Sequence, residues 1–96
     1  MLDLRPDILA AIKTIVYTNL PDCEIRAFGS RVNNSAKPYS DIDIALVTDR
    51  VIDDKVLAII EQSFENSDIP IRVEVCDWHR LTAEFQAIIA KHYIAL

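Results

Sequence analysis

The chain has 96 residues, of which 51% are hydrophobic, and its fifteen acidic and ten basic side chains give a formal net charge of −5. A chain of this length builds one small core, so we expect a single domain over residues 1–96 with little material left to enclose a large substrate. The charge lacks the Lys and Arg excess that drives nucleic-acid binding, and no stretch approaches the roughly 20 apolar residues of a membrane helix, so we expect a cytoplasmic protein that binds neither nucleic acid nor membrane.

The first half of the chain predicts one helix followed by two strands. Apolar residues recur at the spacing of one helix face between Pro6, which suits a first helical turn, and Pro21, which ends the helix. Residues 23–28 then alternate between apolar and other side chains, as a strand does. Residues 33–40 are polar without a period and predict a loop, and residues 41–47 alternate again and predict the second strand.

The second half predicts a helix, a strand and a final helix. The first of these has apolar residues at helical spacing between residues 56 and 64, and Pro70 introduces a strand whose apolar face contains Ile71, Val73 and Val75. The last helix has its apolar residues between Leu81 and His92. This element order predicts an α/β (α+β) fold in which helices cover one side of a small mixed sheet, and it leaves the strand order open.

Gly29 is the only glycine in the chain, and it stands at the end of the first predicted strand, directly before Ser30. Two interpretations are open for a single glycine at this place. It either turns the chain, or it lets the backbone approach a ligand closely because it has no Cβ.

Two carboxylates begin the second predicted strand. Asp41 and Asp43 project from the same face because strand side chains alternate, about 6.6 Å apart along the backbone. Two anions so placed repel each other unless a divalent cation lies between them, and Mg²⁺ suits carboxylates combined with substrate phosphates. An Asp-x-Asp pair is also common at a solvated strand edge, so the pair alone leaves both interpretations open.

The combination of these features is more specific than any one of them. A strand ending in Gly29-Ser30, a ten-residue connection and Asp41-Ile42-Asp43 on a second strand resembles the signature of the DNA polymerase β-like nucleotidyltransferase superfamily. The short length resembles its minimal branch, the MNT domains. Three blocks, residues 27–31, 39–45 and 72–78, resemble the MNT antitoxins that pair with HEPN-domain ribonuclease toxins.

This resemblance implies a polymerase β palm-like fold and an Mg²⁺-dependent nucleotidyltransferase that moves AMP from ATP to a tyrosine hydroxyl of a partner HEPN toxin. Asp41, Asp43 and Glu74 would be the catalytic residues and would hold two Mg²⁺ ions, and Gly29, Ser30 and Arg31 would bind the triphosphate. It also implies a homo- or hetero-oligomer. For Arg31, an exposed surface arginine is the alternative interpretation.

Glu74 departs from the family pattern. The third carboxylate of these proteins is usually Asp, whereas Glu74 is one methylene longer, which moves its oxygens outward by about 1.5 Å. This departure favours an alternative hypothesis, in which the domain is a non-catalytic antitoxin that neutralises its partner by occlusion.

Several other residues are expected to be structural. Alternation places Asp77 on the face opposite Glu74, which predicts a cap or turn before the last helix. Trp78 and Phe85 are expected to pack that helix onto the sheet. Cys23 and Cys76 form no recognisable metal or redox motif and are interpreted as free thiols.

Overall fold

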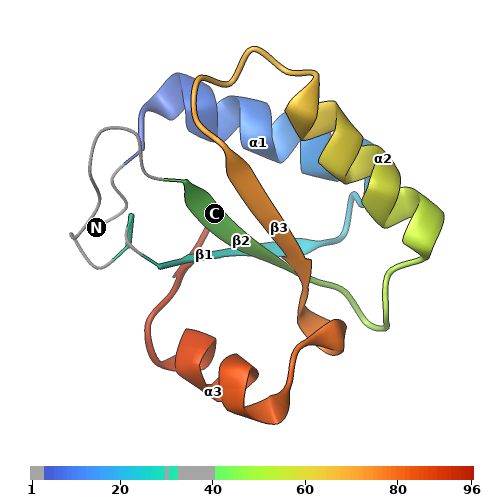
Figure 1. The fold of residues 1–96 in the computed structure, drawn as a ribbon, viewed down its shortest axis with the longest axis vertical. Helices are drawn as coiled ribbons and strands as arrows, with labels where there is room; N and C mark the ends of the chain where they lie inside the picture. The colour runs from blue at the N-terminus through green and yellow to red at the C-terminus, as the bar shows by residue number, and fades with distance from the viewer. Residues whose placement is uncertain (1–3, 30, 33–40) are drawn as a thin grey trace.

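A four-stranded sheet lies at the centre of the computed structural model, which describes residues 4–29, 31–32 and 41–96 (Figure 1). The strands are β1 (Glu24–Phe28), β2 (Ile42–Val47), β3 (Val73–Asp77) and β4 (Ile94–Ala95), in the order β3-β2-β1-β4. β1 is antiparallel to β2 and β4, while β2 and β3 are parallel. The predicted mixed sheet is therefore confirmed. β4 was not predicted, because two residues are too few to show an alternating pattern.

Two helices, α1 (Pro6–Asn19) and α2 (Asp54–Glu65), lie side by side on one face of the sheet (Figure 1). Proline stands in the first turn of α1, where its missing N–H costs no hydrogen bond. The Asp53 carboxylate caps α2 by accepting a hydrogen bond of 2.8 Å from the backbone N–H of Lys55. In the parts of the chain that the structure describes, no helix has the length and apolar character needed to cross a membrane.

The core lies between this helix pair and the sheet. Every second residue of β1 is buried, and so are both apolar helix stripes, as the periodicity predicts. The buried side chains of this core include Ile8, Ile12 and Val16 of α1, Ile25 and Ala27 of β1, Ile42, Ile44 and Leu46 of β2, and Ile60 and Phe64 of α2.

The opposite face of the sheet is covered only in part, by α3 (Ala83–Lys91), which follows the short 3-10 helix η1 (Trp78–Arg80). The Phe85 ring of α3 meets the Phe28 ring edge-on, with 5.9 Å between ring centroids. Because Phe28 alternates with buried Ala27, this contact is on the face away from α1 and α2. The expectation that all helices cover one side is therefore wrong for α3, although Phe85 does pack the helix onto the sheet as predicted.

A second aromatic contact joins η1 and the C-terminal end to the same face. The Arg26 guanidinium lies 4.7 Å from the ring centroids of both Trp78 and Tyr93, and it also forms an ion pair with Glu24. One side chain of β1 thus fixes two segments that are distant in the sequence, and with them the position of α3.

Asp77 links three segments at the end of β3. Its buried carboxylate accepts hydrogen bonds from the backbone N–H of Ile52 (2.8 Å) and of His79 (3.1 Å) and from the Arg80 guanidinium (3.2 Å). The His79 bond caps η1. The prediction that Asp77 is a capping residue is confirmed.

Candidate functional site

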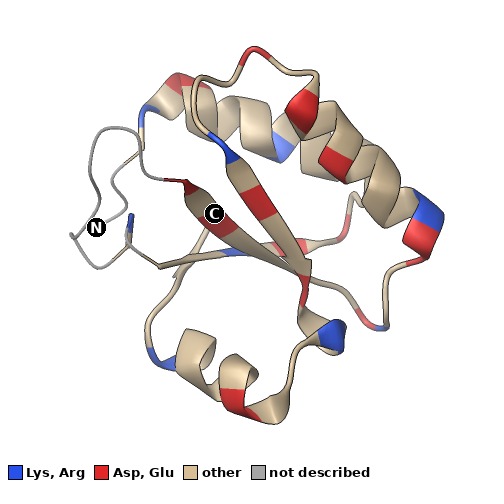
Figure 2. Cartoon of the chain, viewed as in Figure 1, with Lys and Arg blue, Asp and Glu red and all other residues tan. Residues whose placement is uncertain are grey.

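Two carboxylates stand at matched positions of neighbouring strands. Asp43 of β2 is in register with Glu74 of the parallel strand β3, so the two side chains project from the same face of the sheet. Asp41, which is exposed, precedes β2 by one residue, and Figure 2 shows the acidic residues on the two strands. On the other side of Asp43, Phe28 of β1 occupies the matched position, which places the carboxylates next to the α3 contact.

These carboxylates are close enough to affect one another. The pKa of the Asp43 carboxyl is raised above its ordinary value of 3.8, first by burial and then by the negative charges of Glu74 and Asp41. The repulsion that the sequence predicts between Asp41 and Asp43 is therefore present, and Glu74 adds to it. Such a group of anions is favourable only when positive charge is brought to it.

Gly29 lies directly against the Asp43 carboxylate. Its φ of +83° is in the left-handed region that favours glycine, and a Cβ at this position would stand 2.6 Å from Asp43 Oδ2. The backbone N–H of Val32 donates to the Gly29 carbonyl over 3.0 Å and closes a turn. The structure confirms the first interpretation, that Gly29 turns the chain, and it places this turn beside Asp43. Close approach of a ligand to this backbone stays a prediction.

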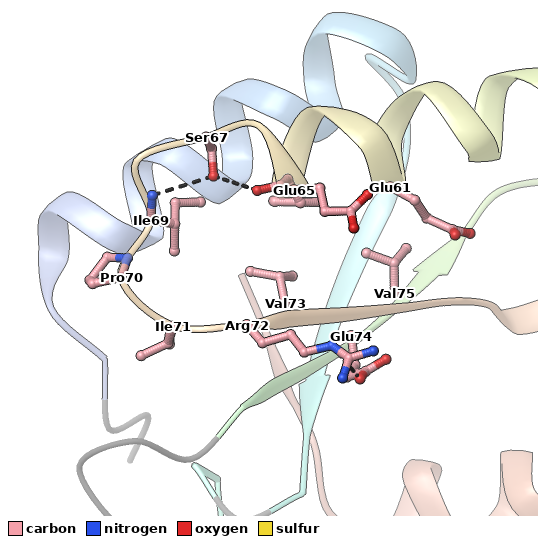
Figure 3. Close-up of a pocket in the computed structure, with 11 residues that line it drawn as sticks. Glu61, Glu65, Ser67, Ile69, Pro70, Ile71, Arg72, Val73, Glu74 and Val75 are labelled. Atoms are coloured by element: carbon pink, nitrogen blue, oxygen red, sulfur yellow. Dashed lines mark hydrogen bonds and ion pairs between the residues drawn. The ribbon is translucent and has the colours of Figure 1, made fainter.

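Glu74 has a partner that the sequence analysis did not assign. The Arg72 guanidinium forms an ion pair of 2.9 Å with Glu74 Oε1, as Figure 3 shows. In the described part of the chain, no three His, Cys, Asp or Glu side chains converge closely enough to hold a metal ion. The structure therefore brings the predicted carboxylates into one neighbourhood but leaves Glu74 paired with Arg72. The signal for Arg72 was its place two residues before Glu74, on the same face of the strand.

The residues predicted to bind the triphosphate are described only in part. Arg31 is 8% exposed, so the alternative of an exposed surface arginine is wrong. Ser30 and residues 33–40, which carry the predicted hydroxyl donor and the predicted loop, lie outside the described residues.

The chemistry of the carboxylates at this place matches a hard divalent cation, although the three side chains do not converge on one point in this structure. Asp41, Asp43 and Glu74 supply carboxylate oxygens alone, which are the ligands that Mg²⁺ prefers. Cys76 lies on the same face of β3, but burial, followed by the charges of Asp43 and Asp77, raises the pKa of its thiol to about 11. The thiol is therefore protonated near neutral pH, so the site offers oxygen ligands rather than a thiolate.

Comparison with known proteins gives consistent results. The family model described as a nucleotidyltransferase domain matches residues 9–94. A protein of Haemophilus influenzae described as a probable protein adenylyltransferase MntA is 38% identical over 95 residues, which cover 99% of this chain and 83% of that protein.

One solved structure supports the fold. The crystal structure of a toxin-antitoxin with AMP-PNP contains a chain that superposes with a TM-score of 0.75, over 90% of this chain and 69% of that one. At 21% identity this likeness shows the fold alone. The family match covers the Gly29 turn, both aspartates and Glu74, and with the identity to the adenylyltransferase it shows that this chain is a transferase and belongs to the family of nucleotidyltransferase domains.

Proposed function

We propose that this chain transfers AMP from ATP to a tyrosine hydroxyl of a partner HEPN-domain ribonuclease toxin, and that it acts in this way as an antitoxin. The observation that carries the proposal is the Asp43 carboxylate, which is held against the Gly29 turn and in register with Glu74. The names of the similar proteins, a probable protein adenylyltransferase and a toxin-antitoxin, support it.

Each residue of the site has its own role in the proposed transfer. The turn at Gly29 brings backbone close to Asp43 without a side chain in the way, so the triphosphate can lie against it, with Ser30 and Arg31 as further phosphate contacts. The acceptor oxygen attacks the α-phosphorus, a new P–O bond forms, and pyrophosphate leaves with the electrons of the broken bond. The hydroxyl proton passes to Glu74, whose Oε2 is not the oxygen that pairs with Arg72.

Asp41, Asp43 and Glu74 would hold Mg²⁺ at this place, Glu74 through Oε1 in place of its Arg72 partner, so that Oε2 remains available for the proton. Ions held by these carboxylates would neutralise the charge that develops on the attacking and leaving oxygens. Without that positive charge the site is electrostatically unfavourable, since burial and two neighbouring anions all disfavour the ionised Asp43.

A transfer assay with nucleotide labelled on the α-phosphate tests the proposal. Wild type, Asp43→Ala and the control Asp49→Ala are each incubated with Mg²⁺, ATP and a purified HEPN-domain ribonuclease toxin. Asp49 is an exposed carboxylate outside the site, so this control removes the same charge. We expect labelling of the partner by wild type and Asp49→Ala, and a loss of at least 100-fold with Asp43→Ala. Equal labelling by all three contradicts the proposal.

A second candidate function is a non-catalytic antitoxin that neutralises its partner by occlusion. The Arg72–Glu74 ion pair favours it, because that pair occupies one oxygen of the third carboxylate. The discriminating variant is Asp41→Ala/Asp43→Ala. Neutralisation of the toxin that survives this double substitution, with association retained, supports occlusion, whereas neutralisation that is lost while association is retained supports transfer.

A further inference from the structure

A groove of about 480 Å³ runs between α2 and the edge strand β3 (Figure 3). Its walls are Glu61, Phe64 and Glu65 of α2, the connection that follows α2, and β3 itself. We call it the edge groove. It reaches the candidate site at Glu74, which belongs to both, and Arg72 lies at the same junction.

The outer edge of β3 presents backbone groups to this groove. β3 is the last strand of the order β3-β2-β1-β4, so among the described residues it has a neighbouring strand on one side only. In the parallel register, Ile42 donates its N–H to the Arg72 carbonyl over 3.0 Å, which directs the backbone of Arg72 and Glu74 toward β2. The N–H and C=O groups of Val73 and Val75 consequently point away from β2, with the spacing that an added strand requires.

The α2 side of the edge groove is negative. Glu61 and Glu65 are both exposed, and their spacing of four residues places them on one side of the helix, where Figure 3 shows them above β3. Like charges at this spacing destabilise a helix, and no ion pair of either residue occurs in the described structure. A basic side chain in the edge groove would offset this repulsion.

We propose that the edge groove is the docking site for the acceptor protein, which binds through an extended segment that adds to β3 as a further strand and carries Arg or Lys side chains opposite Glu61 and Glu65. Backbone hydrogen bonds to Val73 and Val75 supply the alignment. Charge complementarity selects the segment, and it disfavours a second copy of this chain, which has a net charge of −5.

The inference deepens the proposed function, on which it rests, because a segment aligned along β3 passes Glu74. Docking in the edge groove thus brings the acceptor to the carboxylate that takes its proton. The reacting hydroxyl would belong to the docked segment or to a residue folded next to it.

Binding is measured without nucleotide, by fluorescence anisotropy of a labelled nine-residue peptide in which Arg alternates with Val and Thr. The test variant of the full chain is Glu61→Lys/Glu65→Lys. The matched control is Asp49→Lys/Glu84→Lys, which changes the net charge equally at two exposed sites outside the edge groove. We expect the test variant to weaken binding about tenfold or more, and the control less than about threefold. Equal weakening by both variants overturns the proposal.

Strand addition is tested on the peptide, so that folding of the protein is not at issue. Methylating the backbone nitrogens of every second residue blocks one edge of an extended peptide and leaves its charge unchanged. Because only one edge can pair with β3, one methylation pattern should abolish binding and the other should not. Two patterns that bind alike overturn the proposal.

Two further outcomes separate this inference from others. A wild-type chain that sediments as a dimer and becomes monomeric in Glu61→Lys/Glu65→Lys would make a second copy the occupant, and the inference would be wrong. Peptide binding that behaves as expected, combined with no AMP transfer, overturns the proposed function alone. Transfer to the partner that is unaffected by Glu61→Lys/Glu65→Lys overturns the inference alone.

Discussion

Gly29 and Asp43 are in such close contact that a side chain at position 29 would collide with the Asp43 carboxylate. The turn requires a positive φ at Gly29. A Cβ at this position would stand only 2.6 Å from Asp43 Oδ2, so the contact also requires a residue without a side chain. The carboxylate is half-buried, and its pKa is raised by burial and by two other anions. A residue pair that is unfavourable for stability at both positions is typical of a functional site.

Gly29→Ala should cost both stability and activity, for two separable reasons. The positive φ alone destabilises alanine by about 1 kcal/mol, and the close contact with Oδ2 adds to it. In an Asp43→Ala background that second contribution disappears, so the cost of Gly29→Ala should be smaller there. Urea denaturation of the four proteins of this double-mutant cycle measures the difference. An equal cost in both backgrounds would show that the contact with Asp43 is irrelevant.

Asp43→Asn should stabilise the metal-free protein while removing activity. The raised folded-state pKa means that ionised Asp43 opposes folding near neutral pH, and this penalty fades as the pH falls through that pKa. In EDTA at pH 7 we expect a higher Tm than that of wild type, and a weaker dependence of Tm on pH below neutrality. Added Mg²⁺ should raise Tm in wild type only. The control Asp49→Asn should behave as wild type, and a lower Tm for Asp43→Asn in EDTA would contradict the argument.

The sequence predicted these residues better than it predicted their partners. Gly29 and the aspartates were accessible because a single glycine and an Asp-x-Asp pair are local patterns with few alternative explanations. The Arg72–Glu74 ion pair was not predicted, because a spacing of two residues places both side chains on one face of a strand but does not show whether they pair or are solvated. The sequence also left open whether Arg31 is exposed, because a single arginine after a turn shows no pattern of burial.

At the scale of elements, local periodicity predicted α1, β1, β2, α2 and β3 to within about two residues at each end. α1, β1, β2 and α2 bury residues on one face, and β3 packs its partly buried Val73 and Val75 against the same core, so the apolar side chains repeat in the sequence. α3 is different, because Ile89 is its only buried residue and Ile88 is 67% exposed. Its apolar spacing predicts a helix but not which face of the sheet it meets. That choice is made by contacts distant in the sequence, between Phe28 and Phe85 and around Arg26.

Asp77 should be essential for the junction of β3, η1 and the segment before α2. Asp77→Ala leaves two backbone N–H groups without their acceptor, one of them buried at Ile52, and should destabilise the protein by about 3 kcal/mol. Asp77→Asn retains one acceptor oxygen and should cost less.

Because Asp77 lies on the face opposite Glu74, neither variant should change binding of Mn²⁺ to the folded chain, measured by calorimetry. Asp54→Ala, which removes the other Arg80 partner at an exposed position, is the control and should change stability little. Weaker Mn²⁺ binding by Asp77→Asn would assign Asp77 to the site instead.

Taken as a whole, the molecule has two dissimilar sheet faces. One is closed by α1 and α2 over the apolar core, and the other presents carboxylates beside an incompletely covered surface that includes α3. One cysteine lies on each side of the sheet. Cys23 belongs to the core cluster, and Cys76 lies on the same face as Asp43. Burial is the largest cause that raises the pKa of both thiols, so their titration reports how well each face excludes water.

The free energy of unfolding should therefore fall in the alkaline range because the two thiols titrate there, and replacing both cysteines should reduce this fall. Burial raises the pKa of Cys23 and of Cys76 from 9.0 to about 11, so the folded state retains both thiol protons over a range in which the unfolded chain loses them. Their contribution to the free energy of unfolding is complete below pH 9 and is lost as the pH rises through 11, on the order of 1–2 kcal/mol for each thiol. Urea denaturation at pH 8, 9.5 and 11 should show this decline in wild type and a shallower one in Cys23→Ala/Cys76→Ala, in which tyrosine and lysine titration is unchanged. The two single variants show how much of the decline in unfolding free energy comes from the thiol on each face. A decline in the double variant that is as steep as in wild type would mean that water reaches both thiols in the folded protein.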